Sequence, residues 1–379
     1  MNMGNHMALT GGRIAVALTA IALGLSTFMV GMAMALFAVL PMLLSVRAGR
    51  LIDAIGVRRP MKVGAAMTFA GCALPCAWNS RPALLLAAVL VGTGFMMCQV
   101  ATQNHLGNAE AGQRLRNFSL LSLMQAVSGF GGPLLTGLAI DHLGYRYAFG
   151  LLALPPLLSL WGVHLLRRRL ARPPPPLPGS PTLAPPRVRD LVAIAPLRRV
   201  LLANMTLSGA WDTHLFIVPI FGVSIGLSAT TIGVVLSCFA AATFVVRLLL
   251  PVIQRYLAPW KLVTVAMFMA SASFLLYPLF DTVAMLMAMS FLLGLALGSC
   301  QPSLLALLHQ HSPPGRAAEA AGIRMALINT TQMSVPMAFG ALGAAVGLAP
   351  LFWAYSLILL SSAWRTRKLA FAPRPDHRE

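Results

Sequence analysis

The sequence predicts an all-α integral membrane protein of about twelve transmembrane helices, arranged in two pseudo-symmetric halves of six. Three observations predict this fold: the composition, the spacing of the apolar segments and an internal repeat. Of 379 residues, 58% are hydrophobic and only 10% are charged, whereas about 25% of a typical soluble domain is charged. So few charges cannot cover a water-soluble protein of this size, and most of the chain is expected to lie in lipid.

Twelve apolar segments come close to the roughly 20 residues that a helix needs to cross a bilayer. In order, they are 14–23, 27–45, 61–78, 83–102, 118–140, 148–166, 200–222, 231–250, 261–280, 283–305, 321–344 and 348–364. The first is too short to cross about 30 Å at 1.5 Å per residue. It must borrow residues from about Met3, running over Gly11, Gly12 and Arg13. We therefore expect either an unusually short first helix or a chain whose true start lies upstream.

The basic residues predict how the helices are oriented in the membrane. The formal net charge is +19, and the loops on one side of the predicted membrane hold nearly all of the lysines and arginines. The exceptions are Arg81 and Arg146, on the other side, and Arg13, inside the first span. The positive-inside rule makes the basic side cytoplasmic, with both termini on it, as expected in a bacterial inner membrane. The charge thus indicates topology and lipid contact, and no nucleic acid partner is expected.

No metal, cofactor or catalytic cluster is expected. The five cysteines all fall within predicted spans, where they are expected to be small core residues; they are Cys72, Cys76, Cys98, Cys238 and Cys300. Three histidines near the basic side have no carboxylate or cysteine at a ligand spacing, and these are His105, His309 and His311. An enzyme would need a clustered nucleophile, acid and base, so the sequence predicts that this protein is not an enzyme.

An internal repeat divides the chain in two. The stretch Gly24–Gly31 matches Gly226–Gly233, a shift of 226 minus 24, or 202 residues. The same shift pairs Gln99 with Gln301 and Arg114 with Arg316, and one inserted residue later Pro133 pairs with Pro336. We therefore expect an N-terminal half at 1–166, a Pro-rich cytoplasmic linker at 167–198, a C-terminal half at 199–364 and a cytoplasmic tail at 365–379. The prolines of the linker favour a polyproline II spacer.

A glycine-rich and arginine-rich motif follows the second predicted span. It reads Gly49, Arg50, Leu51, Ile52, Asp53, Ala54, Ile55, Gly56, Val57, Arg58, Arg59, and a degenerate copy lies at 249–261. Together with the two six-span halves and the central linker, this motif resembles the major facilitator superfamily over nearly the whole chain. The family usually has an arginine where this chain has Ala54.

The resemblance implies a role for this motif in the rocking of the two halves. By resemblance, Asp53 is the acid of a conformational latch, set in a tight turn that Gly49 and Gly56 permit. A carboxylate in that place can accept hydrogen bonds from the amides at a neighbouring helix N-terminus. Three residues are its candidate partners: Arg114, Arg316 and Glu319. The alternative for Arg58 and Arg59 is that they only anchor the helix end in lipid headgroups.

The polar residues inside the predicted spans are candidates for the transport pathway. Arg13 and Asp212 are the only charged residues that we expect well inside spans, at similar depths on the paired first and seventh spans. We expect them to face each other across the interface, with Trp211 as an aromatic wall. The alternative is that Arg13 reaches the headgroups and Asp212 caps a local irregularity.

Five neutral amides accompany these charges, and they are Gln99, Gln301, Gln125, Asn329 and Gln332. Each either contacts the solute or joins helices by hydrogen bonds. Gln99 and Gln301 are the pair that we expect to contact the solute, because the repeat relates them and the resemblance places the fourth and tenth spans at the cavity.

The sequence predicts secondary active transport of a small solute by alternating access, which the resemblance describes as the rocking of one half against the other. We expect proton-coupled efflux, with protonation of Asp212 as the coupling step, in a monomer in the lipid bilayer. The stretch Gly129–Gly137 resembles an element associated with exporters in the family, although Thr136 replaces one glycine. Two alternatives stay open, namely proton-coupled uptake of a metabolite and a receptor or scaffold that does not transport. The identity of the solute is not readable from the sequence.

Overall fold

The structure is a computed structural model that describes residues 2–107, 111–165, 188–313 and 317–370, and within some helices only the backbone. These residues form thirteen α-helices and one 3₁₀ turn, and no strand occurs among them. In chain order they are α1 (Asn2–Ala22), α2 (Thr27–Ile55), α3 (Arg58–Ala77), α4 (Arg81–Gly107), α5 (Ala111–Leu143), α6 (Tyr145–Leu165), α7 (Val188–Ala193), α8 (Ala195–Ser224), α9 (Ala229–Tyr256), α10 (Pro259–Leu276), η1 (Tyr277–Leu279), α11 (Val283–His311), α12 (Ala317–Val346) and α13 (Ala349–Ala370). The predicted all-helical fold is confirmed.

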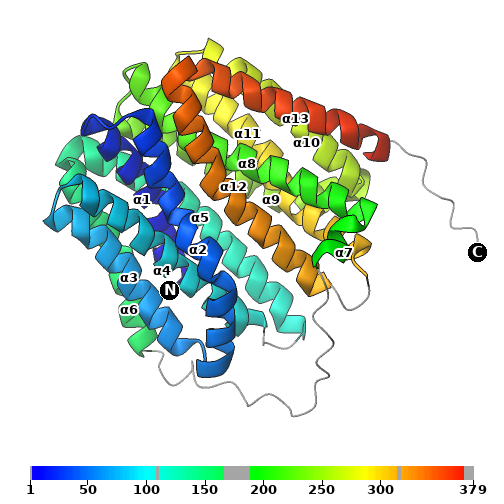
Figure 1. The fold of residues 1–379 in the computed structure, drawn as a ribbon, viewed down its shortest axis with the longest axis horizontal. Coiled ribbons are helices and arrows are strands. Elements are labelled where there is room, and N and C mark those ends of the chain that lie inside the picture. Colours follow the sequence, from blue (N-terminus) through cyan, green and yellow to red (C-terminus); the bar gives the residue numbers. More distant parts are fainter. Residues whose placement is uncertain (1, 108–110, 166–187, 314–316, 371–379) are drawn as a thin grey trace, which may run out of the picture.

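The long helices form two groups of six that lie side by side (Figure 1). The first group, α1 to α6, holds together through contacts such as α3 with α4 and α1 with α5, and the second, α8 to α13, through contacts such as α9 with α11 and α10 with α13. The groups meet where α2 packs on α12 and α5 packs on α9, with α1 against α8 between them. Most of the predicted Pro-rich linker lies outside the described residues.

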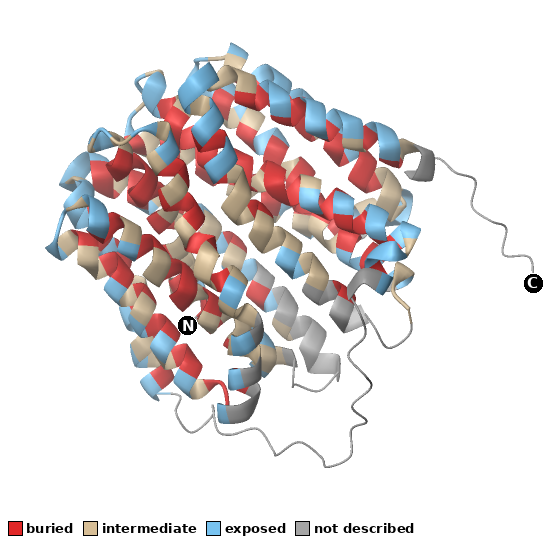
Figure 2. Ribbon diagram, viewed as in Figure 1, coloured by how far each residue is buried: buried red, intermediate tan, exposed pale blue. Residues whose placement is uncertain are grey.

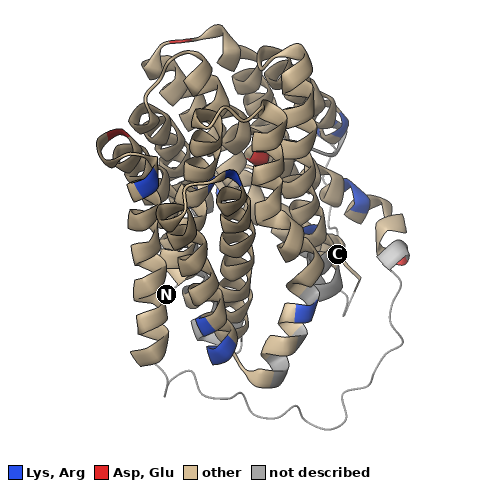
Figure 3. Cartoon of the chain, turned by 60° about the vertical axis from the view of Figure 1, so that its left-hand side comes forward, with Lys and Arg blue, Asp and Glu red and all other residues tan. Residues whose placement is uncertain are grey.

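We name the two ends of this bundle by their chain segments. The linker face is the end at which α1 and α8 begin and α6 ends at Leu165. The opposite face carries the short connections after α1, α5, α8 and α12. Lysine, arginine and acidic residues are sparse along the helices (Figure 3).

The first helix is longer than its apolar segment. It begins at Asn2 and runs through Gly11, Gly12 and Arg13, so its 21 residues span about 31 Å at 1.5 Å per residue. Its symmetry mate α8 has 30 residues, so α1 is the shorter of the pair. The glycines of α1 allow this helix to lie very close to its neighbours. A Cβ at Gly11 would lie 2.7 Å from Leu152 Cδ2 and 3.0 Å from the carbonyl oxygen of Gly132.

The glycine and arginine motif is mostly helical, which confines the expected tight turn to Gly56 and Val57. Helix α2 continues to Ile55, and only two residues separate it from α3. Gly56 supplies the turn with a φ of 79°, a conformation that glycine adopts without steric cost. Gly49 lies inside α2, where an added Cβ would have no neighbour within 4 Å. The apolar residues within the motif favour continuation of α2 up to Gly56, where the helix ends.

In the part of the chain that the structure describes, seven helices are long and apolar enough to cross a membrane by length and composition alone, and they are α2, α4, α5, α6, α9, α10 and α11. The other five helices of 18 residues or more are α1, α3, α8, α12 and α13. Three of these five carry a charged residue in their interior: Arg13 in α1, Asp212 in α8 and Arg324 in α12.

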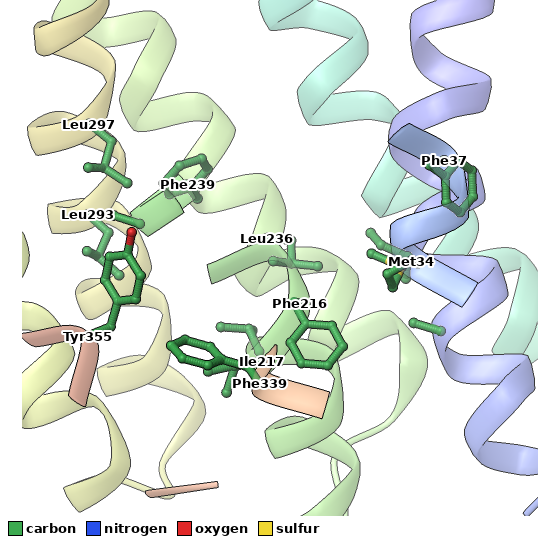
Figure 4. Packing of buried hydrophobic residues seen from close by; sticks show 14 of the residues in the cluster. Met34, Phe37, Phe216, Ile217, Leu236, Phe239, Leu293, Leu297, Phe339 and Tyr355 are labelled. Atoms are coloured by element: carbon green, nitrogen blue, oxygen red, sulfur yellow. The ribbon is translucent and has the colours of Figure 1, made fainter. Parts of the chain in front are cut away.

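Buried apolar side chains continue from one half into the other (Figures 2 and 4). Met34 and Phe37 of α2 belong to the same cluster as Phe216 of α8 and Phe239 of α9, and each is at most 4% exposed. Many long apolar residues on the outside are exposed, among them Leu158, Leu248 and Leu357. An apolar exterior of this kind is the surface that lipid covers.

Glycines bring the halves into close contact near the opposite face. A Cβ at Gly233 of α9 would lie 2.6 Å from the carbonyl oxygen of Pro133 in α5, and one at Gly340 of α12 would lie 2.8 Å from that of Thr27. Both helix pairs, α5–α9 and α2–α12, contain such close contacts because the internal repeat places a glycine at matching positions in the two halves. Small residues of this kind allow helix backbones to approach closely within membranes.

Replacement of Gly233 by alanine tests this contact. We expect Gly233→Ala to lower the free energy of unfolding by about 1–3 kcal/mol, because the added methyl group overpacks the α5–α9 contact. Gly129→Ala is the matched control, since a Cβ there would lie 3.8 Å from Ala240 Cβ, at ordinary contact distance. Thermal unfolding in nanodiscs measures both variants. Equal midpoints for Gly233→Ala and the wild type would contradict the close contact.

Candidate functional site

Arg13 and Asp212 lie in the interior of the bundle, one in each half. Arg13 is on α1 and Asp212 on α8, two helices that contact each other. Asp212 is 5% exposed, and the two side chains interact electrostatically without forming a salt bridge within 4.0 Å. The Arg13 guanidinium lies 5.8 Å from the centre of the Phe37 ring, and its Nε has no hydrogen-bond partner. A charge in such a place is costly and indicates a functional role.

The Asp212 carboxylate also connects α8 to α12. Thr331 Oγ1 donates a hydrogen bond of 3.3 Å to Asp212 Oδ2. Trp211, the predicted aromatic wall, is half-buried and packs edge-on against Phe239 of α9, with ring centres 4.6 Å apart. His214 is fully buried against the same phenylalanine ring, with ring centres 4.6 Å apart. Asp212 thus has one hydrogen-bonding hydroxyl, that of Thr331, and lies within electrostatic range of Arg13 and Tyr355.

The predicted amide Gln99 belongs to a small network in the N-terminal half. Its Oε1 accepts hydrogen bonds from Asn2 Nδ2 at 2.6 Å and from Gln125 Nε2 at 3.1 Å. These bonds join α1, α4 and α5. Gln99 and Gln125 thus connect helices here, which was one of the two alternatives for such amides.

Gln301 has a different partner in the C-terminal half. Its Oε1 accepts a short hydrogen bond from Arg324 Nη2, and Arg324 Nε donates one of 2.8 Å to Asn204 Oδ1. We call Asn204, Gln301 and Arg324 the arginine cluster. The shift of 202 residues that relates Gln99 to Gln301 also relates Asn2 to Asn204. The two networks are therefore symmetry mates on the first and fourth helices of each half, but the third member is neutral in one and charged in the other.

Two further arginines are half-buried along helices, in addition to the predicted Arg13 and Asp212. Arg324 lies seven residues into α12 and Arg247 nine residues before the end of α9. Both residues are near the ends of apolar segments, which suggested loops. Helices α9 and α12 extend beyond those segments, so both side chains lie along helices.

The remaining amide candidates are less connected. Asn329 and Gln332 are half-buried on α12, and neither has a hydrogen bond to another described side chain or backbone group. Their role in solute contact stays a prediction.

The predicted latch is only partly described. Arg58 is half-buried near the start of α3, Arg59 is exposed, and Gly49 and Gly56 take the positions given above. The side chains of Asp53, Arg114 and Glu319 and all of Arg316 lie outside the described residues. The latch on the linker face therefore stays a prediction.

An acidic cap, which sequence reasoning missed, lies on the opposite face. Asp141 near the end of α5 accepts hydrogen bonds from the backbone amides of Ala229, at 3.1 Å, and Thr230, at 2.7 Å, in the first turn of α9. These amides have no partner within their own helix, and the helix dipole favours a negative charge there. The contact joins one half to the other.

The sequence held a signal for this cap. The pattern Asp-x-x-Gly-x-Arg of Asp53, Gly56 and Arg58 recurs at Asp141, Gly144 and Arg146. Both glycines have positive φ, 79° and 87°. The same local pattern therefore ends α2 on the linker face and α5 on the opposite face.

Taken together, two six-helix halves with an interior of few, buried polar groups define a membrane transporter. A family model described as Major Facilitator Superfamily matches residues 2–327 and 200–379. The chain belongs to the Major Facilitator Superfamily, and as predicted it is a transporter and not an enzyme. Comparison with curated proteins finds no match.

Among solved structures, the chain is similar to a mutant of the peptide transporter POT. In complex with sulfate, that protein gives a TM-score of 0.76 at 16% identity, over 97% of this chain and 94% of the other. In complex with alafosfalin, it gives 0.72 at 16% identity, over 98% and 94%. At this identity the similarity concerns the fold, and it confirms the predicted two-half architecture.

Removal of the cap on α9 should loosen the contact between α5 and α9. We expect Asp141→Ala to destabilise the protein by about 1 kcal/mol, as for other lost helix caps. Hydrogen exchange of the peptide that covers residues 229–232 should accelerate. Asp281→Ala is the control, because Asp281 is an exposed acid just before α11. Unchanged exchange at 229–232 in Asp141→Ala would show that the carboxylate does not hold this helix end.

Proposed function

We propose that this protein is a secondary active transporter that exports a small solute in exchange for protons. Four features support the proposal: a buried acid between the halves, an arginine on the facing helix, a carboxylate cap at one face and a predicted latch at the other. The observation that carries it is the position of Asp212. It is the only acid among the described side chains that is buried inside the bundle, and an intramembrane acid is a typical proton carrier.

Protonation of Asp212 changes the charge balance at the contact between α1 and α8. When ionised, the carboxylate offsets the buried Arg13 guanidinium and accepts a hydrogen bond from Thr331. When neutral, it leaves Arg13 without its counter-charge and weakens the attraction between the halves. The other titratable groups nearby are His214 on α8 and Tyr355 on α13, whose hydroxyl donates to the Thr206 carbonyl oxygen at 2.8 Å. Only Arg13 belongs to the other half, so Asp212 and Arg13 form the pair that a proton separates.

The two acidic patterns suggest how such a change could produce alternating access. In this structure Asp141 caps α9 on the opposite face, where glycines also bring α5 and α9 into close contact. The matching pattern around Asp53 ends α2 on the linker face, beside the helix pair α2 and α12. We propose that the two acids cap helices of the other half in alternate states, so that one face closes as the other opens.

The membrane topology in this proposal follows from the distribution of basic residues. The linker face is cytoplasmic, as the positive-inside rule indicates, and the membrane is a bacterial inner membrane. The protein acts as a monomer with domains at 1–166 and 199–364, joined by the linker. The Gly129–Gly137 element supports export as the direction, while uptake with protons remains the second possibility. Gln99 and Gln301 are the proposed solute contacts, with Gln125, Asn329 and Gln332 one layer behind them along the proposed pathway.

Proton flux in proteoliposomes tests the proposal. We expect solute-dependent proton movement under a pH gradient for the wild type and a loss of at least tenfold for Asp212→Asn, which cannot exchange a proton. A panel of small metabolites and amphipathic cations supplies the solutes, and a pH-sensitive dye trapped in the vesicles measures the flux. The direction of the gradient that drives solute accumulation distinguishes export from uptake.

Asp190→Asn serves as the control, because Asp190 is an exposed acid in the short helix α7. Its flux should equal that of the wild type. Equal solute-dependent proton flux in Asp212→Asn and the wild type would exclude Asp212 as the proton carrier. A solute transport rate that does not depend on the pH gradient would exclude proton coupling.

A further inference from the structure

Positive charge exceeds negative charge among the described side chains inside the bundle. Three arginines, Arg13, Arg247 and Arg324, are partly or fully covered, while Asp212 is the only acid among them. Asp212 already faces Arg13. His6 on α1 lies within electrostatic range of both Arg13 and Arg247, so this part of the interface has cations from both halves. Arg247 and Arg324 have no carboxylate partner among the described side chains. A buried charge without a counter-charge is expensive in a low dielectric.

The arginine cluster shows how one of these cations is held. Arg324 Nε and Nη2 donate to the side-chain oxygens of Asn204 and Gln301. These neutral acceptors orient the guanidinium without neutralising it. A guanidinium has five N–H donors in a planar fork, so the two bonds leave further donors for another group.

Asn204 adds a second unmet donor. Its side chain is fully buried, its Oδ1 accepts from Arg324, and its Nδ2 has no hydrogen-bond partner. Buried polar atoms are nearly always paired, and an unpaired one calls for a ligand or another explanation. The cluster therefore has spare donors and a spare positive charge but no spare acceptor beyond the amide oxygens already used.

The symmetry mate in the other half shows that the charge is not needed for packing. There Asn2, Gln99 and Gln125 make the same kind of helix connection with amides alone. An arginine in the C-terminal network thus adds a cost of burial that a neutral side chain avoids. Such a cost is typical of a group that serves function.

We propose that the arginine cluster is a binding site for the anionic group of the transported solute, a carboxylate or a phosphate. The proposal rests on the proposed transport function and names the class of its solute. An anion supplies the acceptor oxygens that Arg324 and Asn204 lack, and the planar guanidinium matches a carboxylate or phosphate in two-point geometry. For one-for-one exchange, export of an anion against an entering proton is favoured by both the pH gradient and a negative interior potential.

Binding is measured on the full chain in nanodiscs by thermal unfolding, at constant chloride and without a pH gradient. The probes are matched by shape: acetate with acetamide, benzoate with benzamide and benzylamine, and inorganic phosphate. We expect a saturable rise in the unfolding midpoint with at least one anion and none with the amides or the amine. Arg324→Gln should weaken the apparent affinity about tenfold or more, the usual scale for a hydrogen-bonded charge.

A second variant keeps the test valid if Arg324→Gln does not fold. Asn204→Asp has nearly the same shape and places a carboxylate on Arg324 Nε, where Asn204 Oδ1 accepts at 2.8 Å. We expect it to fold and to lose the response to anions, because its own carboxylate occupies the guanidinium. Arg198→Gln is the control that removes one positive charge from an exposed position in the first turn of α8. It should keep the wild-type response.

The proposal would be overturned if no anion raises the unfolding midpoint of the wild type, or if benzylamine or an amide raises it while the anions do not. It would also be overturned if Asn204→Asp and Arg324→Gln respond to anions as the wild type does. The measurement needs no transport. Anion binding without proton-coupled flux would therefore support this site and reject the proposed function, and flux without anion binding would do the reverse.

Discussion

The cost of placing a charge inside a membrane governs how this protein is built. A single charged side chain at the centre of a bilayer costs at least about 2.5–3.5 kcal/mol, so the chain can hold very few of them. The helices that carry Arg13, Asp212 and Arg324 are α1, α8 and α12, which lie where the two halves meet. Apolar helices such as α6 and α10 present exposed leucine and other apolar side chains to the surroundings, whereas α2, α5 and α9, which are apolar too, pack where the halves meet.

The internal repeat explains why the polar groups come in related sets. Asn2 with Gln99 and Asn204 with Gln301 occupy equivalent positions in the two halves. The first two side chains bond to each other, whereas Arg324 bridges the second two. Symmetry of the backbone therefore provides two similar frames, and substitution at one position makes them differ. Such a difference lets one half hold a charge while the other keeps a neutral network. In a rocking transporter, a solute between the halves then meets two chemically distinct walls.

The contacts between the halves combine a weak and a strong component. Glycines such as Gly233 and Gly340 allow close backbone approach, which gives dispersion contacts over a broad area without directional bonds. The Asp141 carboxylate adds two hydrogen bonds at a helix end. Helices that pack through small residues can separate and pack again without leaving a buried polar group unpaired. A carboxylate at the membrane surface can be hydrated by water when the helix that it caps moves away. Both properties suit an interface that must open.

Much of the fold was predictable from the sequence because its signals are local or periodic. Apolar length, the shift of 202 residues and the basic loops need no knowledge of tertiary contacts, and the depths of Arg13 and Asp212 follow from the rise of a helix. Helix ends were less predictable. Helices α2 and α9 run past their apolar segments because a glycine or a turn, and not the end of the apolar segment, terminates them. Partnerships between side chains could be decided only by the tertiary structure. Arg324 contacts Asn204 and Gln301 because of the face that α12 turns toward α8 and α11. Asp141 reaches α9 because of the relative position of the two halves. Both depend on packing between segments far apart in the chain, which no local pattern encodes.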